Sequence, residues 1–558
     1  MALPKNRHPI ELETDPFDLL NETAGTLREK LEGGTLTSVQ LAQACLDRID
    51  EYDSWTKAVL APAPRENVYA IAKELDAERT AGNVRSALHG IPILIKDNIC
   101  TDPRLGMDTT AGAAALVGSK PQGNAPVVQQ FIDAGAIVIG KANLSELSWF
   151  RSASAPAGWS TVGRQTQSPY VVGGFLLGWD SGCGHTNPGG SSSGPAVGVA
   201  AGFAPLSIGT ETVGSLILPA NRADLYTMKP TVGSVSVEGI VPISKFCDSA
   251  GPMAKCVSDM AAALDIMLSE TSGAKGRPAG GYRTRATGKW EGLRIGSLNP
   301  DDWDFSEETR KKFEGVEEDM KESTLKAYAT VKGVADSFHE NIDLIDPEKF
   351  SPDGKSILGQ IFDATFRHEL NGYLSTLASS KVLTLEELIR YNEDHIGEYR
   401  DKYTDGEDPP PEEYTKQEFL DSAQKKKLPK SEIDGLVKLM RRLGRDEGVD
   451  KAFEKYDINI ILGPAESPIT TVAAAAGMFH FFLTPFLYPT LQPRVSFSEA
   501  NQDDEDPSTE LRLPYHLPTS RTALLAGQAS TAWTSSCCGS QPGRAADTAG
   551  ERVGEDFP

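Results

Sequence analysis

The chain has 558 residues, with 55 basic and 78 acidic side chains and a net charge of −23. Such an excess of negative charge repels polyanions, which excludes nucleic acid as the main partner. The seven cysteines are an odd number and only Cys537 and Cys538 are adjacent, a pattern that indicates neither a disulfide framework nor a metal cluster. The length allows one large enzyme domain or several small ones.

The sequence has neither the pattern of a secretory signal nor that of a membrane-spanning helix. The first residues include acidic side chains and no apolar core, so they do not have the pattern of a secretory signal. The longest uncharged stretch, residues 467–493, is long enough to span a bilayer, but His480 and three internal prolines interrupt it. We therefore expect no membrane helix and a cytoplasmic location, while the oligomeric state leaves no recognisable pattern.

The first part of the chain predicts helical scaffold. After an extension over residues 1–16, residues 17–80 have helical composition, and Thr37 and Gln40 are spaced as a capping box ahead of an apolar stripe. Residues 90–98 (GIPILIKDN) then form a β-branched run that is apolar on both faces, as in a strand inside a parallel sheet.

An alternation of strands and helices continues beyond residue 98. Residues 134–147 again give a short apolar strand followed by helix-compatible residues, which favours an α/β organisation. Residues 164–194 are rich in Gly, Ser and Pro and predict a loop, residues 195–203 suit a closely packed helix, and residues 209–215 predict a second loop.

Lys96 ends the apolar run of residues 90–95. Burial at the end of such a strand would remove water from its ammonium group and lower its pKa, and a neutral amine can act as a base. Taken alone, a lysine at a strand end can equally extend its charge to solvent. The two Gly/Ser loops, GGSSSG at residues 189–194 and GTETVGS at residues 209–215, supply hydroxyl groups that give Lys96 a possible catalytic context.

These three segments, in this order, resemble the amidase signature family, in the form found in fungal amidases. The similarity continues in KANLSE at residues 141–146, MKPTVG at residues 228–233 and DSAGPM at residues 248–253, and it extends over about residues 17–478. Ordered agreement over several segments is far more specific than one Gly/Ser loop.

The resemblance implies a fold and a domain organisation. The fold is α/β, with a large mixed, mostly parallel central sheet covered by helices on both faces and with helical additions. The amidase signature domain would occupy residues 17–478, with a catalytic core at about residues 80–260. Residues 300–455, which are dense in Lys and Glu, would form a helical, charged cap or insertion.

The resemblance also implies a mechanism without a cofactor or a metal. Ser215 would attack the carbonyl of a small-molecule amide, Ser191 would relay protons after a cis peptide bond, and Lys96 would be the base. The products would be an acyl-enzyme and ammonia or an amine. Backbone N–H groups of Thr212, Val213 and Gly214 would form the oxyanion hole, and Gly190, Ser192 and Gly194 would support the relay loop.

Three features depart from the family pattern. Val213 stands where relatives carry Gly or Asp, and a β-branched residue would strain the loop if a positive φ were required there. Residues 173–188 look like an insertion beside the relay loop. After about residue 478 the family's closing segments are missing, so we expect residues 479–558 to be disordered and to add no last strand.

Other functions remain open at this stage. A glutamine-hydrolysing subunit of a tRNA-dependent amidotransferase shares the same fold and site, but Leu216 and Ile217 follow the serine where such subunits have arginine. The motif GSSSG at residues 190–194 also fits the nucleophile elbow of an α/β-hydrolase, yet no apolar strand precedes it. Finally, the departures are compatible with an inactive or incorrectly assembled homologue.

Overall fold

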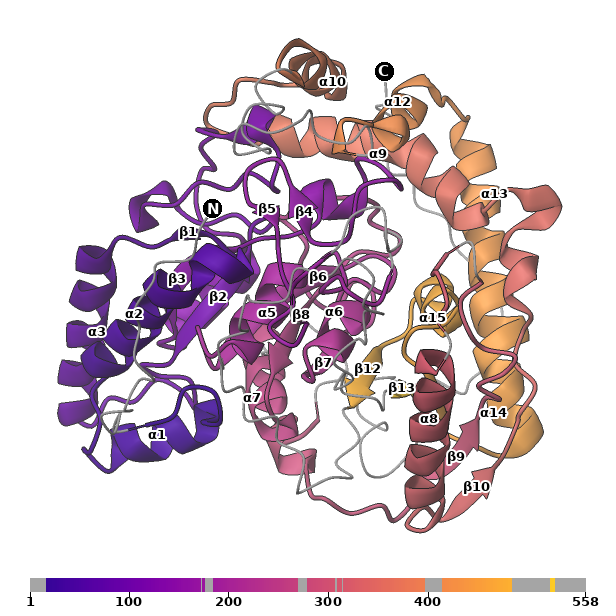
Figure 1. Cartoon of the computed structure of the whole chain (residues 1–558), viewed down its shortest axis with the longest axis horizontal. Coiled ribbons are helices and arrows are strands. Elements are labelled where there is room, and N and C mark those ends of the chain that lie inside the picture. Colours follow the sequence, from indigo (N-terminus) through magenta and orange to yellow (C-terminus); the bar gives the residue numbers. More distant parts are fainter. Residues whose placement is uncertain are drawn as a thin grey trace, which may run out of the picture.

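A computed structural model describes residues 17–171, 173–175, 184–268, 278–306, 309–313, 315–396, 414–483 and 522–526. Its main feature is an eleven-stranded sheet with the order β1-β3-β2-β6-β8-β7-β12-β13-β11-β9-β10, which crosses the molecule from left to right in Figure 1. The strands have the following bounds: β1 Val59–Pro62, β2 Pro92–Lys96, β3 Ile137–Ala142, β6 Leu206–Glu211, β7 Tyr226–Lys229, β8 Ser249–Ala254, β9 Arg294–Ser297, β10 Ser337–His339, β11 Ile460–Pro464, β12 His480–Leu483 and β13 Thr522–Ala526.

The sheet is mixed. Strand β2 pairs in parallel with β3 and β6, and β9 pairs in parallel with β10 and β11. Strands β7, β8, β12 and β13 join these two parallel groups through antiparallel pairs. A separate two-stranded sheet consists of β4 (Trp159–Ser160) and β5 (Arg164–Gln165).

Helices cover the central strands on both faces. Every residue of β2, β3, β6 and β8 is buried. Because successive side chains of a strand point to opposite faces, complete burial requires packing on both. The prediction of an α/β fold around one large mixed sheet is confirmed, including the strand that Lys96 ends.

Helices of the first half pack against the β1–β8 part of the sheet. They are α1 (Ala24–Glu32), α2 (Ser38–Thr56), α3 (Arg65–Thr80), α4 (Pro126–Asp133), α5 (Ser193–Ala200), α6 (Ile217–Arg222) and α7 (Val257–Met267). Thr37 caps α2, and its hydroxyl and the Gln40 side chain form the predicted capping box. Helix α5 begins in the predicted Gly/Ser loop, and its residues 193–199 are all buried.

The predicted cap region, residues 300–455, is largely helical. Its helices are α8 (Val316–Lys332), α9 (Ile357–Ser375), α10 (Leu385–Asp394), α12 (Glu418–Lys425), α13 (Lys430–Arg441) and α14 (Asp450–Tyr456), and α9 and α13 lie at the rim of the molecule in Figure 1. Each of these helices also buries apolar residues; α9, for example, buries Phe366, Leu370 and Leu374. Helix α15 (Ile469–Ala476) follows β11 and is buried along most of its length.

The segment after residue 478 corrects one expectation. Strands β12 and β13 lie between β7 and β11, so these two pieces of the predicted tail do add strands to the sheet. The physical reason is that β7 and β11 each offer an unpaired edge, whose N–H and C=O groups need partners. Residues 484–521 and 527–558 of the predicted tail lie outside the described residues, as do residues 1–16.

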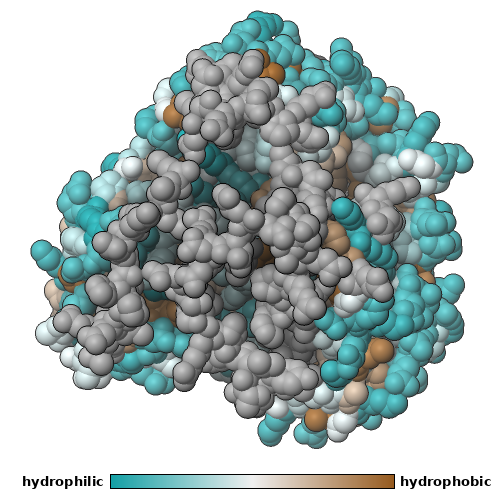
Figure 2. Space-filling model, viewed as in Figure 1, coloured by the Kyte–Doolittle hydropathy of each residue, from teal (hydrophilic) through white to brown (hydrophobic). Residues whose placement is uncertain are grey.

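The described surface on the face seen in Figure 2 is mostly hydrophilic. Hydrophilic residues dominate the rim, and apolar ones appear singly. Large exposed apolar side chains, such as Trp55, Leu325 and Leu383, come from separate parts of the chain. Among the described residues, no helix combines the length and the apolar composition needed to cross a bilayer.

Candidate active site

Lys96 lies at the carboxyl end of β2 and is completely buried. Its Nζ is 2.8 Å from Oγ of Ser191, 2.8 Å from Oγ1 of Thr210 and 3.3 Å from the Thr210 carbonyl oxygen. Burial lowers the pKa of Lys96 to about 7, although the nearby carboxylates Asp248 and Glu211 act in the opposite direction. The side chain therefore has a substantial neutral fraction near neutral pH.

The first serine loop brings Ser191 to Lys96. The peptide bond between Gly190 and Ser191 is cis, Ser191 is completely buried, and its carbonyl accepts the Ser145 N–H at 3.1 Å. Gly194 packs so closely on a neighbouring strand that an added Cβ would lie 2.4 Å from the backbone nitrogen of Asn143. The loop thus needs glycine at residue 194, and the resulting close contact fixes the start of α5 against the sheet.

Ser192 joins the two serine loops. Its hydroxyl donates to the Thr210 carbonyl at 2.9 Å, and its N–H donates to the Ser215 carbonyl at 3.2 Å. These bonds hold the backbone of Ser215 beside the loop that carries Ser191. The predicted loop at residues 209–215 begins later than expected, because β6 continues through Glu211.

Residues 212–215 make a tight turn between β6 and α6. Ser215, at the end of this turn, is 7 % exposed and therefore largely buried. The positive φ of this turn, 75°, belongs to Gly214, and Val213 is not one of the residues with positive φ. Valine at residue 213 therefore occupies ordinary backbone geometry, and the strain foreseen if it had needed a positive φ does not arise.

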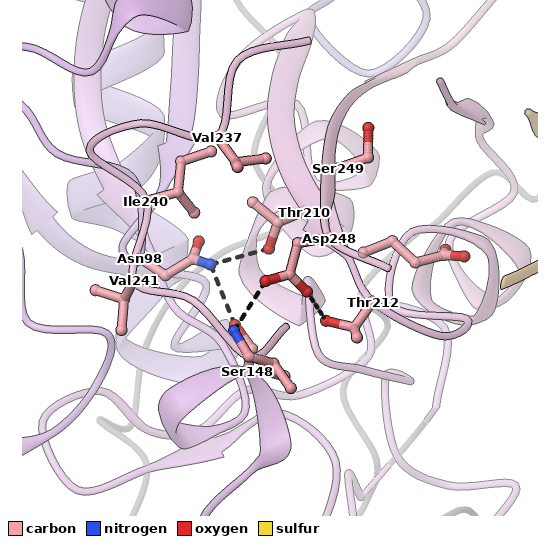
Figure 3. Close-up of a pocket in the computed structure, with 11 residues that line it drawn as sticks. Asn98, Ser148, Thr210, Thr212, Val237, Ile240, Val241, Asp248 and Ser249 are labelled. Atoms are coloured by element: carbon pink, nitrogen blue, oxygen red, sulfur yellow. Dashed lines mark hydrogen bonds between the residues drawn. The ribbon is translucent and has the colours of Figure 1, made fainter. Parts of the chain in front are cut away.

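A small pocket lies at the carboxyl end of β6 (Figure 3), and Thr210, which lines it, also contacts Lys96. Its volume is about 10 Å³, which is room for one water-sized molecule. The Asn98 side-chain amide donates to Thr210 Oγ1 at 3.0 Å and to Ser148 Oγ at 3.1 Å, while its Oδ1 oxygen is buried without a protein partner. On the other side Thr212 donates to the Asp248 carboxylate at 2.6 Å.

Asp248 carries the acidic group of this pocket. Burial raises its pKa to about 6, against the effect of the Thr212 hydroxyl and the N–H groups of Ile243 and Ser244. Asp248 and Lys96 thus have pKa values that burial displaces toward neutrality in a shared, water-poor environment. Perturbed titratable groups of this kind are typical of functional sites.

A buried charge network anchors the chain that enters the first serine loop. Arg222, at the end of α6, donates to the Asn187 carbonyl at 3.0 Å and pairs with Glu466 at 2.8 Å. Glu466 also pairs with the buried Arg310 at 2.9 Å. Residues 184–188 of the predicted insertion are therefore fixed to the core, whereas its residues 176–183 lie outside the described residues.

The structure brings together the residues singled out by the sequence. Lys96 and Ser191 are in contact, and Ser215 and Ser192 share a backbone hydrogen bond. The remaining predicted residues are Gly190, Thr212, Val213 and Gly214, which lie in the two loops, and Gly194, which lies in the first turn of α5. Sequence reasoning missed Thr210, Asn98, Asp248 and His480. Within the described residues, no three His, Cys, Asp or Glu side chains are grouped as metal ligands would be.

Comparisons with known proteins agree with this architecture. A family model described as Amidase matches residues 40–332. A Schizosaccharomyces pombe protein classed as an amidase is 30% identical over 498 residues, covering 84% of this chain and 80% of its own. The crystal structure of native peptide amidase from Stenotrophomonas maltophilia matches with a TM-score of 0.69 and 30% identity, covering 83% of this chain and 90% of its own.

A component of an amidotransferase gives a shorter match. This glutamyl-tRNA(Gln) amidotransferase subunit from Chloroflexus aurantiacus is 36% identical over 284 residues, which are 50% of this chain and 54% of that protein. The amidase matches extend over the serine loops and the helical region that follows them. The chain therefore belongs to the amidase family and is a hydrolase of amide carbon–nitrogen bonds.

Proposed function

We propose that this protein hydrolyses a small carboxamide through an acyl-enzyme, with Ser215 as nucleophile, Ser191 as proton relay and Lys96 as base. The observation that carries the proposal is the 2.8 Å contact between Lys96 Nζ and Ser191 Oγ in a fully buried setting. A neutral lysine there has two N–H bonds and one lone pair. Thr210 offers two oxygen acceptors for the N–H bonds, which leaves the lone pair for the Ser191 hydroxyl.

The proton transfers balance in both halves of the reaction. As Ser215 Oγ forms a bond to the carbonyl carbon, its proton passes to Ser191 Oγ, and the Ser191 proton passes to Lys96 Nζ. When the carbon–nitrogen bond breaks, the same path returns a proton to the leaving nitrogen. A water molecule then attacks the acyl carbon and gives a proton through Ser191 to Lys96. As the bond between the acyl carbon and Ser215 Oγ breaks, the relay returns that proton to Ser215 Oγ, and the acid leaves.

The turn at residues 212–215 is the proposed oxyanion hole. The backbone N–H groups of Thr212, Val213 and Gly214 would donate to the oxygen of the tetrahedral intermediate. Two features support a fixed turn: the Thr212 carbonyl accepts from Lys229 at 2.7 Å, and Leu216 N–H donates to Glu211 at 2.8 Å. A turn held from both ends can present its N–H groups without reorganisation during the reaction.

A free-standing amidase is favoured over a component of an amidotransferase complex. The peptide amidase fold covers 83% of this chain and 90% of its own, whereas the amidotransferase match covers only about half of each chain. Purification of the intact protein without other polypeptides bound to it would agree with this choice. Activity that requires an added amidotransferase partner would contradict it.

The test is the intact mass of the purified protein after exposure to a fluorophosphonate, which reacts with activated serine. One adduct is expected on the native chain, none on Ser215→Ala, and strongly slowed formation on Lys96→Ala and Ser191→Ala. Monodisperse, folded protein that forms no adduct would refute an assembled site. An adduct that persists in Ser215→Ala would refute the choice of nucleophile.

A further inference from the structure

Glu211 connects the nucleophile turn to the interior. Its carboxylate oxygen Oε2 accepts the N–H groups of Leu216 at 2.8 Å and Ile217 at 3.2 Å, the two residues that follow Ser215. Glu211 is only 1% exposed, so this contact is shielded from water. Any shift of the carboxylate must therefore move the backbone that carries Ser215, or leave two N–H groups without an acceptor.

The other oxygen of Glu211 faces a histidine from the distant end of the chain. His480 Nε2 lies 2.6 Å from Glu211 Oε1, and His480 is 2% exposed. Strand β12 places it there, because His480 is the register partner of Lys229 on β7. The Lys229 ammonium lies 3.8 Å from the same oxygen and donates to the Thr212 carbonyl at 2.7 Å.

The three side chains thus hold the nucleophile turn on both sides. Lys229 contacts it before Ser215, at Thr212, and Glu211 contacts it after Ser215, at Leu216. Burial alone would raise the pKa of Glu211, but His480, Lys229 and the Leu216 N–H lower it to about 2. The carboxylate is therefore ionised at all physiological pH values and acts as a constant acceptor.

We propose that Glu211 and His480 are positioning residues for Ser215, with His480 acting through Glu211. His480 donates one hydrogen bond that fixes the orientation of the carboxylate, and the carboxylate fixes the backbone after the nucleophile. The expected effect of these residues on the reactivity of Ser215 rests on the proposed function. The geometric part, that His480 orders the turn at residues 212–217, stands independently of any catalysis.

Two substitutions that each introduce a carboxamide test whether His480 acts through its hydrogen bond to Glu211 or through its volume. In His480→Gln the amide can still reach Glu211, whereas in His480→Asn the same amide is one methylene shorter and falls short. Phe481→Leu is the matched control on the same strand, because successive β12 side chains point to opposite faces. All three are expected to remain folded, which near-ultraviolet circular dichroism checks.

The kinetic readout is the rate of fluorophosphonate labelling, together with kcat and KM on any carboxamide that is turned over. We expect His480→Asn to lower the labelling rate and kcat about tenfold or more, with KM changed less than about twofold, and His480→Gln to restore most of the loss. Phe481→Leu should keep the native rate. In a Glu211→Gln background, His480→Asn should cause no further loss, since both residues act through one contact.

Hydrogen exchange of the backbone amides measures how well His480 orders the turn at residues 212–217, without the need for catalysis or labelling. Amides of residues 212–217 should exchange faster in His480→Asn than in the native protein, and His480→Gln should restore their protection, while β2 stays unchanged in all variants. Equal exchange in all variants would overturn the inference, and so would additive losses in the double variant. Faster exchange in a protein that is never labelled would uphold the inference and reject the proposed function.

Discussion

The pH dependence of acylation tests the role of Lys96 directly. Burial places the pKa of Lys96 at about 7, and only its neutral form can accept a proton from Ser191. With that pKa, the neutral fraction is about 9% at pH 6, about 50% at pH 7 and about 91% at pH 8. The labelling rate of Ser215 should therefore rise about tenfold between pH 6 and pH 8 and then level off.

The assay is a time course of fluorophosphonate labelling at half-unit pH steps from 5.5 to 9, read by intact mass. Lys96→Arg is the matched control, because a guanidinium keeps its proton throughout this range. Its labelling should stay low and flat. Asp248→Asn removes a negative charge that raises the pKa of Lys96, so the midpoint should move to lower pH.

Two results would refute the reasoning about Lys96. One is a native rate that does not change between pH 6 and pH 8. The other is a midpoint near pH 7 that persists in Lys96→Arg, which would assign the titration to another group. Asp248, with a pKa of about 6, is the first alternative, and Asp248→Asn would then abolish the titration.

Three further predictions concern stability and folding. Because the pKa of Lys96 is lowered in the folded state, native stability should rise from pH 7 to pH 9 by up to about 1.4 kcal/mol per pH unit, and urea unfolding of Lys96→Met should lack this contribution. Glu466→Gln weakens the pairing of two buried arginines and should lose about 3–5 kcal/mol in urea unfolding, whereas Glu386→Gln at an exposed pair should change stability by under about 1 kcal/mol. Gly194→Ala places a Cβ 2.3 Å from a backbone oxygen and should yield insoluble protein on expression, while Gly435→Ala, with open space around it, should stay soluble and folded.

The sequence predicted those parts of the site whose signals are local. Lys96 ends a run that is apolar on both faces, which indicates an interior strand, and the Gly/Ser composition indicates the loops that carry Ser191 and Ser215. The capping box at Thr37 is equally local and was also predictable. In each case the residues that define the feature lie within a few positions of one another.

The partners of these residues could not be predicted in the same way. Thr210 is 114 residues from Lys96, and His480 is 269 residues from Glu211, so only the pairing of strands brings them together. The expectation that residues 479–558 add no last strand was wrong. It relied on missing family motifs, whereas a strand edge needs only a short segment that can pair with it.

The order of strands has a consequence for synthesis of the protein. Strand β7 ends at Lys229, but its neighbour β12 begins only at His480. At on the order of 10 residues per second, a ribosome needs tens of seconds to make the intervening chain. During that interval the first six strands of the sheet can form, while the β7 edge stays open to pairing with other nascent chains. Expression at lower temperature or with abundant chaperones should therefore raise the yield of monodisperse protein.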